Sequence, residues 1–107
     1  MPVHFIGDWC NDGDFEGATW YTSRAGQNES CPTSILSITA FGYGYSGTNS
    51  FCEIEKKPVV KKHSAPSGTS YYVTVTARCR PNGPTTPGKL QTLEFMRYKH
   101  SLRVTPK

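Results

Sequence analysis

The sequence predicts a small all-β domain, folded as an antiparallel barrel of five to six strands with two disulfides; a β-sandwich is the second choice. Three observations favour this class. Hydrophobic residues make up only 36% of the 107 residues, whereas 10 Gly and 8 Pro supply turns. Several runs alternate apolar and polar residues. Four cysteines can cross-link a chain whose core is small. Closure into a barrel would protect the sheet edges of this single domain, residues 1–107.

Alternation identifies the strand-like segments, because successive side chains of a strand point to opposite faces. Leu36 and Ile38 share one face, Cys52 and Ile54 share another, and Cys79 ends the longest apolar face. The expected segments, in order, are 3–10, a short piece at 19–22, 34–41, 50–62, 71–80, 89–98 and 101–106. The predicted core consists of Trp9, Leu36, Ile38, Ile54, Val73, Val75, Leu102 and Val104.

Turn-forming residues separate these segments. The Gly-rich run 42–49 is predicted as a connector, and 63–70 and 81–88 as loops. Pro58 should stop or bulge the segment 50–62, since Pro cannot donate a hydrogen bond to a neighbouring strand. No stretch shows a helical stripe of apolar residues, and no apolar run has the length of a membrane-spanning helix.

The four cysteines allow three disulfide connectivities. We favour Cys10–Cys31, which would close the turn-rich front of the chain, and Cys52–Cys79, whose members lie inward on two strand-like runs. Free thiols and a zinc site are the alternatives, but no C-x2-C pair exists and the intervals are long for zinc. Disulfides predict an exported protein, periplasmic or secreted, from which we expect a signal peptide to have been cleaved.

Several segments together resemble a group of small exported proteins of rhizobia and related α-proteobacteria. The resemblance covers nearly the whole chain and includes "LSITAFGYGYSG", "FCEIEK", "YYVTVTARC" and the closing "LRV". It implies export and a disulfide-bonded β fold, and it implies no activity. The "GDW" at Gly7–Trp9 also resembles the first strand of lipocalin-like barrels. The matching positions are Trp9, Cys10, Leu36, Ile38, Gly42, Cys52, Ile54, Cys79, Leu102 and Val104.

The acidic front of the chain has the residue types of a cation site. Asp8, Asp12, Asp14 and Glu16 could offer oxygen ligands to Ca2+, but their spacing fails the EF-hand template. We expect a solvated turn in which Asp and Asn accept hydrogen bonds from the backbone, and we predict no metal and no cofactor.

Catalytic constellations are weak. His4, His63 and His100 lie far apart, there is no G-x-S-x-G motif, and no second acidic cluster faces the first. The sequence therefore predicts a protein that is not an enzyme.

Charge is distributed unevenly along the chain. Residues 1–31 carry five acids against one arginine, a balance of −4, and residues 32–107 carry eleven Lys and Arg against three Glu, a balance of +8. Such a basic half attracts acidic partners, although lysines also serve solubility and edge protection. The candidate binding side chains are Lys56, Lys57, Arg78, Arg80 and Arg97, with Lys61, Lys62, Lys99 and Arg103 nearby.

Two rings in the Gly-rich connector complete the candidate surface. Tyr43 and Tyr45 are predicted to contact a partner from an exposed loop, 42–48, because tyrosine is enriched at interfaces. We therefore predict a binding module whose partner is a protein or an anionic polymer or surface, with nucleic acid disfavoured by export. A small-ligand barrel is the alternative function.

Overall fold

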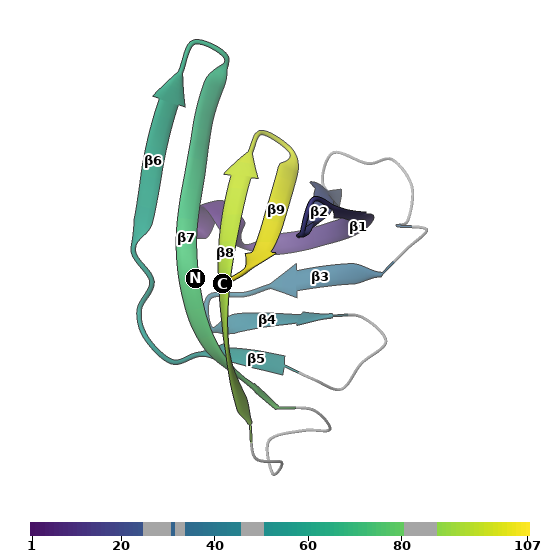
Figure 1. Cartoon of the computed structure of the whole chain (residues 1–107), viewed down its shortest axis with the longest axis vertical. Helices are drawn as coiled ribbons and strands as arrows, with labels where there is room; N and C mark the ends of the chain where they lie inside the picture. Colours follow the sequence, from purple (N-terminus) through teal and green to yellow (C-terminus); the bar gives the residue numbers. More distant parts are fainter. Residues whose placement is uncertain (25–30, 32–33, 46–50, 81–87) are drawn as a thin grey trace.

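The computed structural model describes residues 1–24, 31, 34–45, 51–80 and 88–107. They contain one short 3-10 helix, η1, and nine strands (Figure 1). Their bounds are η1 Val3–Phe5, β1 Gly7–Phe15, β2 Ala18–Ser23, β3 Ile35–Ile38, β4 Gly42–Tyr45, β5 Phe51–Ile54, β6 Val60–Ala65, β7 Gly68–Arg80, β8 Lys89–Tyr98 and β9 Ser101–Pro106. None of the helices described is long and apolar enough to cross a membrane.

Eight of these strands form a closed antiparallel barrel, and β6 lies outside it (Figure 1). The order is β5-β4-β3-β1-β2-β9-β8-β7, and a β5–β7 pairing closes the ring. The prediction of an all-β barrel is confirmed, but the predicted number of strands was too small. The missed strands are short or fully exposed, so alternation marks them poorly.

The length of strand β7 determines the position of β6. β7 spans 13 residues and pairs with β8 along most of its length. Its other edge is divided: residues 68–73 pair with β6, and residues 77–80 pair with β5. The hairpin of β6 and β7 therefore extends beyond the barrel, as Figure 1 shows.

The core occupies the barrel interior. All the predicted core residues are buried except Ile54, which is half-buried and packs against the others. Phe5 of η1 fills one end of the barrel, where it packs against Phe95 and where the Trp9 indole N–H donates to the Phe5 carbonyl at 3.1 Å. The sequence predicted a strand from residue 3. Residues 3–5 instead form the turn that lets Phe5 close this end.

Two predicted connecting segments are strands. Gly42–Tyr45 is β4, with Gly42 tightly packed against β5, and Val60–Ala65 is β6. The sequence assigned 42–49 to a connector and 63–70 to a loop, and it placed only 60–62 of β6 in a strand-like segment, because β4 is Gly-rich and β6, whose residues are all exposed, has no apolar face. Pro58 does interrupt the segment predicted as 50–62: β5 ends at Ile54 and β6 starts at Val60.

Local backbone chemistry explains the first hairpin. Glu16 and Gly17 both have positive φ, 52° and 79°, and they connect the paired residues Phe15 and Ala18. A two-residue hairpin with positive φ at both positions is the turn that matches strand twist. The acidic Glu16 thus occupies the tip of a tight turn.

Candidate functional site

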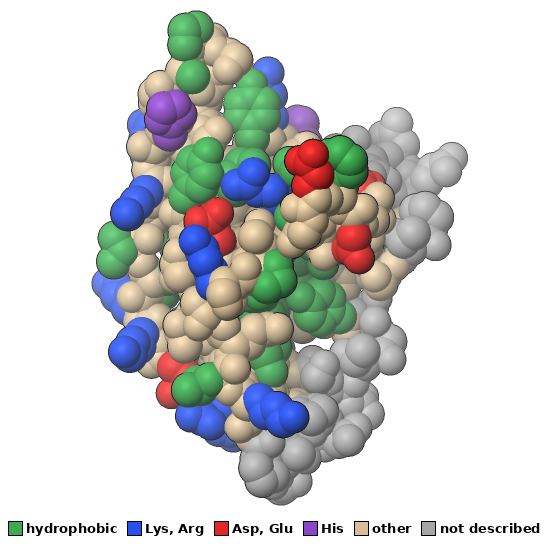
Figure 2. All heavy atoms as spheres, viewed as in Figure 1, with side chains coloured by type: hydrophobic (Ala, Val, Ile, Leu, Met, Phe, Trp, Pro, Cys, Tyr) green, Lys and Arg blue, Asp and Glu red, His purple; other side chains and the backbone are tan. Residues whose placement is uncertain are grey.

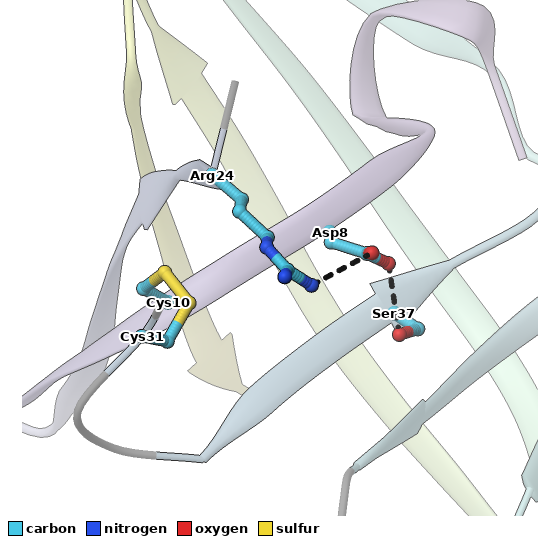
Figure 3. A network of polar contacts seen from close by, with 5 residues as sticks. All are labelled: Asp8, Cys10, Arg24, Cys31 and Ser37. Atoms are coloured by element: carbon cyan, nitrogen blue, oxygen red, sulfur yellow. Dashed lines mark hydrogen bonds and ion pairs between the residues drawn. A yellow bond between two sulfur atoms is a disulfide. The ribbon is translucent and has the colours of Figure 1, made fainter. Parts of the chain in front are cut away.

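Both predicted disulfides are present. Cys10–Cys31 joins β1 to the chain that precedes β3, and Figure 3 shows it beside Asp8 and Arg24. Cys52–Cys79 joins directly opposed residues of β5 and β7, at the seam that closes the barrel. The described residues contain no free cysteine.

The acidic residues at the front of the chain lie apart and have separate partners. Asp8 accepts a hydrogen bond from the Ser37 hydroxyl at 2.9 Å and lies 3.8 Å from Arg24 (Figure 3). Asp12 accepts from Thr22, and Asp14 accepts from Thr19 at 2.7 Å. Within the described residues, no group of three or more His, Cys, Asp or Glu is placed to hold a metal ion.

Tyr43 and Tyr45 do not form the predicted exposed loop. Tyr43 is fully buried in β4, and its hydroxyl donates to the Gln91 side chain at 3.0 Å. Burial raises the pKa of the Tyr43 phenol and also raises that of the half-buried Tyr45. The predicted contact role is therefore wrong for the buried Tyr43, that of the half-buried Tyr45 stays a prediction, and residues 46–48 lie outside the described residues.

Arg97 does not join the basic surface either. Its guanidinium lies 5.2 Å from the Trp9 ring centroid and donates to the carbonyls of His4 at 2.6 Å and Lys99 at 3.0 Å. These contacts tie η1 to the end of the barrel. Its role in this structure is to close the barrel end.

We expect Arg97→Met to lower the free energy of unfolding by about 1–3 kcal/mol, because the partly buried His4 carbonyl would lose a charged donor. Met keeps most of the aliphatic stem. Urea unfolding followed by tryptophan fluorescence measures the change. The control is Arg24→Met, whose exposed ion pair contributes about 0–1 kcal/mol. Equal losses in the two variants would contradict this role for Arg97.

Arg78 and Arg80 are also not fully exposed charges. The Arg78 guanidinium lies 2.7 Å from the Glu55 carboxylate and donates to the Gly88 carbonyl at 3.3 Å. Arg80 is half-buried on the same strand. Of the predicted binding residues, this leaves Lys56 and Lys57 as exposed cations.

Lys56 and Lys57 border a surface groove of about 520 Å3. We call it the lysine groove. It lies between the segment that connects β5 to β6 and the outer face of β7 and β8. Four lysines contribute to its lining, together with polar and apolar residues: Lys56, Lys57, Lys61, Lys107, Pro58, Val59, Tyr72, Val73, Thr74, Thr76 and Glu94.

The groove forms because the segment that connects β5 to β6 moves away from the edge of β7. After β5, the Glu55 amide still donates to the Thr76 carbonyl at 3.0 Å. The chain then departs, with Pro58 in the detour, and rejoins β7 where Val60 pairs with Val73. In Figure 1 this detour is the curved segment to the left of β7.

The charge of the groove is mostly uncompensated. Glu94 is its acidic member, and it already pairs with Arg103 at 3.6 Å and with Lys107 at 3.3 Å. Among the described carboxylates, none lies within ion-pair distance of Lys56, Lys57 or Lys61. Figure 2 shows Lys and Arg side chains along the left margin, over β6 and the segment before it.

Sequence reasoning missed two members of the groove wall, Thr74 and Thr76. Their outward position was visible in the alternation of 71–80. The sequence did not show which segment lies next to these side chains, because only the tertiary structure brings residues 55–59 beside β7.

A second hollow of about 450 Å3 lies at the barrel end. Trp9 and Arg97 line it, together with Asp8 and Arg24 of the ion pair described above. Arg24 is paired with Asp8, and Arg97 donates to backbone carbonyls that hold η1 at the barrel end, so this hollow is the weaker candidate for a charged ligand.

Comparison of the chain with protein-family models, curated proteins and solved structures found no match.

Proposed function

We propose that this protein is an exported, non-catalytic binding module that holds an anionic partner, a protein or a polymer or surface, at the lysine groove. One observation carries the proposal: Lys56, Lys57 and Lys61 line one groove, and none of them forms an ion pair with a described carboxylate. Like charges held together repel, so their proximity favours a negatively charged partner.

Export is supported by the two disulfides, which persist in oxidising compartments. The resemblance to small exported proteins of rhizobia and related α-proteobacteria supports the same compartment, periplasmic or secreted. An exported protein meets acidic proteins and polymers more often than nucleic acid, so nucleic acid is the least favoured polyanion.

The arrangement of titratable residues supports binding without catalysis. His4 stacks on Tyr71 at 3.8 Å, His63 belongs to β6, and His100 lies in the turn before β9. The acids at the front are held by Ser, Thr and Arg partners. None of the described side-chain hydrogen bonds joins a histidine ring to a carboxylate or to a hydroxyl nucleophile, the arrangement that hydrolysis needs.

The alternative, a small-ligand barrel, has less support. Large side chains occupy the interior positions, including Trp9, Tyr43 and Phe95, each exposed by no more than 2%. Ligand sites are concave and typically hold about 300–1,000 Å3. The volume of the hollow at the barrel end falls in that range, but the residues that border this hollow hold η1 in place.

Retention on a heparin column tests the proposal, because heparin is a soluble polyanion. We compare Lys56→Gln/Lys57→Gln/Lys61→Gln with the charge-matched triple Lys62→Gln/Lys89→Gln/Lys99→Gln, whose residues do not line the groove. Three exposed ionic contacts at about 0.5 kcal/mol each predict a loss of affinity of about tenfold for the groove variant.

Salt should weaken wild-type binding steeply, because exposed charges are screened within about 10 Å at 0.1 M ionic strength. The matched control should keep most of its affinity. Equal losses in the two triples would mean that net charge alone drives retention, and the proposed site would be wrong.

A further inference from the structure

The strand β6 lies at the end of the sheet, and β7 is its neighbour on one side. In Figure 1 it forms the left margin of the molecule. Every residue of β6 is exposed, and none of the described backbone hydrogen bonds outside the β6–β7 ladder involves residues 60–65. Within the described chain, the edge of β6 that faces away from β7 is therefore open.

The strand register determines which backbone groups reach this open edge. In an antiparallel pair, hydrogen-bonded partners direct their N–H and C=O toward each other, and the alternate residues direct theirs away. The Thr76 carbonyl accepts from the Glu55 amide, on the edge of β7 that pairs with β5 and β6. Tyr72 has the same parity as Thr76, and the β7–β8 register has no bulge between them. Tyr72 and its partner Lys61 are therefore a hydrogen-bonded pair.

Val60, Lys62 and Ser64 consequently direct their N–H and C=O groups to the open edge. They alternate along β6 with Lys61 and His63, which face β7. We call these three residues the edge residues. An exposed row of backbone donors and acceptors is a template for an extended peptide, which binds by adding a strand to the sheet.

The charges on β6 disfavour a second copy of this chain as the added strand. Consider two β6 edges that pair antiparallel through all three edge residues. This register places Lys62 opposite Lys62 of the second copy, and Lys61 opposite its His63. Like charges directly opposite each other destabilise a strand pair, whereas opposite charges stabilise it. The lysines therefore favour an added strand that carries acids.

The two lysines also indicate where the acids lie in that strand. Lys61 and Lys62 are consecutive, so their side chains point to opposite faces of β6. A complementary strand needs one acid on each face, which places the acids on consecutive residues. None of the described carboxylates lies within ion-pair distance of Lys61 or Lys62.

We propose that the open edge of β6 binds an extended acidic segment of a protein partner as an added strand, with two consecutive carboxylates facing Lys61 and Lys62. The inference rests on the proposed function, because it takes the anionic partner to be a protein and names the conformation of the segment that binds. Backbone hydrogen bonds to the edge residues supply the register, and the two lysines supply the preference for acids.

A synthetic peptide tests the inference on the whole protein. The probe is acetyl-Thr-Thr-Glu-Glu-Val-Thr-amide, titrated into the 15N-labelled chain. The amides of Val60, Lys62 and Ser64 should gain protection from hydrogen exchange, and those of Lys61 and His63 should change little because β7 already binds them. A peptide with Lys in place of both Glu should bind at least about tenfold more weakly. Binding that leaves the three edge amides unprotected overturns the inference.

Backbone methylation of the peptide separates strand addition from charge attraction. Successive N–H groups of a strand point to opposite sides, so one of the two Glu amides faces β6 and the other faces away. N-methylation of the first should weaken binding about tenfold or more, and N-methylation of the second should be tolerated. Both methylated peptides keep the charge. Equal affinities of the two would mean that the peptide does not add as a strand.

One variant distinguishes this inference from the proposed function. Lys62 does not line the lysine groove, so Lys62→Gln should weaken the peptide about threefold and leave heparin retention equal to that of Lys89→Gln. Unchanged peptide affinity in Lys62→Gln would contradict the charge pairing. If the groove triple loses heparin affinity while the peptide leaves the edge amides unprotected, the groove remains and strand addition is wrong. If the peptide adds to β6 while the groove triple keeps its heparin affinity, the groove is wrong and the edge remains.

Discussion

Replacing Gly42 by alanine is expected to lower the free energy of unfolding by about 3 kcal/mol, near the upper end of the usual cost of overpacking. A β-carbon at Gly42 would lie 1.9 Å from the carbonyl oxygen of Cys52 and 2.9 Å from its carbonyl carbon. Both are backbone atoms, so no side chain can rotate away. The β4 and β5 strands would have to separate where Gly42 pairs with Glu53. Urea unfolding measures the loss.

Gly13→Ala distinguishes the two reasons for which a position requires glycine, backbone strain and a close approach between strands. Gly13 has a φ of 105°, and a β-carbon added there would have nothing within 4 Å, so alanine meets only backbone strain. We expect a cost of about 1–2 kcal/mol. If Gly42→Ala costs no more than Gly13→Ala, the close approach of β4 and β5 does not limit position 42.

Removal of the Cys52–Cys79 disulfide by alanine at both positions should cost about 3 kcal/mol, from the chain entropy regained by the unfolded state across 27 residues. The position of the bond adds a local effect. It lies in the short β5–β7 seam that closes the barrel, where residues 51–54 pair with 77–80. Hydrogen exchange at the Glu53 and Glu55 amides should accelerate, since both face β7.

Alanine at Cys10 and Cys31 provides the matched control. That disulfide spans 21 residues, so its entropic contribution is similar. It joins β1 to the chain before β3, away from the seam. Its loss should leave exchange at Glu53 and Glu55 close to wild type once global stability is matched with denaturant. Equal acceleration in both double variants would contradict the seam argument.

Much of the barrel was predictable from local patterns. Leu36, Ile38, Val73 and Val75 alternate with polar residues, and the structure buries them. The same alternation placed Cys52 and Cys79 inward, which favoured the pairing that the structure contains. These signals succeed because an inward position in a strand is set by the period of the chain itself.

The errors have specific physical causes. Glycine occurs both in turns and where two strands approach closely. Gly42 allows the close approach of two strands, although its sequence context resembles a turn. β6 has no apolar face, because β7 alone pairs with it and solvent reaches both sides. Arg97 shares the parity of Leu93 and Phe95, which are buried. This alternation could have predicted an inward position for Arg97, but the positive charge of the residue suggested an exposed one.

The sequence by itself determined the all-β class and the inward faces of the main strands, because both depend on residue type and a period of two, and it favoured the two disulfide pairs among three connectivities. Only the tertiary structure decided which charges act together. It directed Arg97 to Trp9 and paired Arg78 with Glu55, leaving Lys56, Lys57 and Lys61 around one groove. That selection depends on where the detour after β5 meets the edge of β7. Contacts between distant segments carry no periodic signal in the chain.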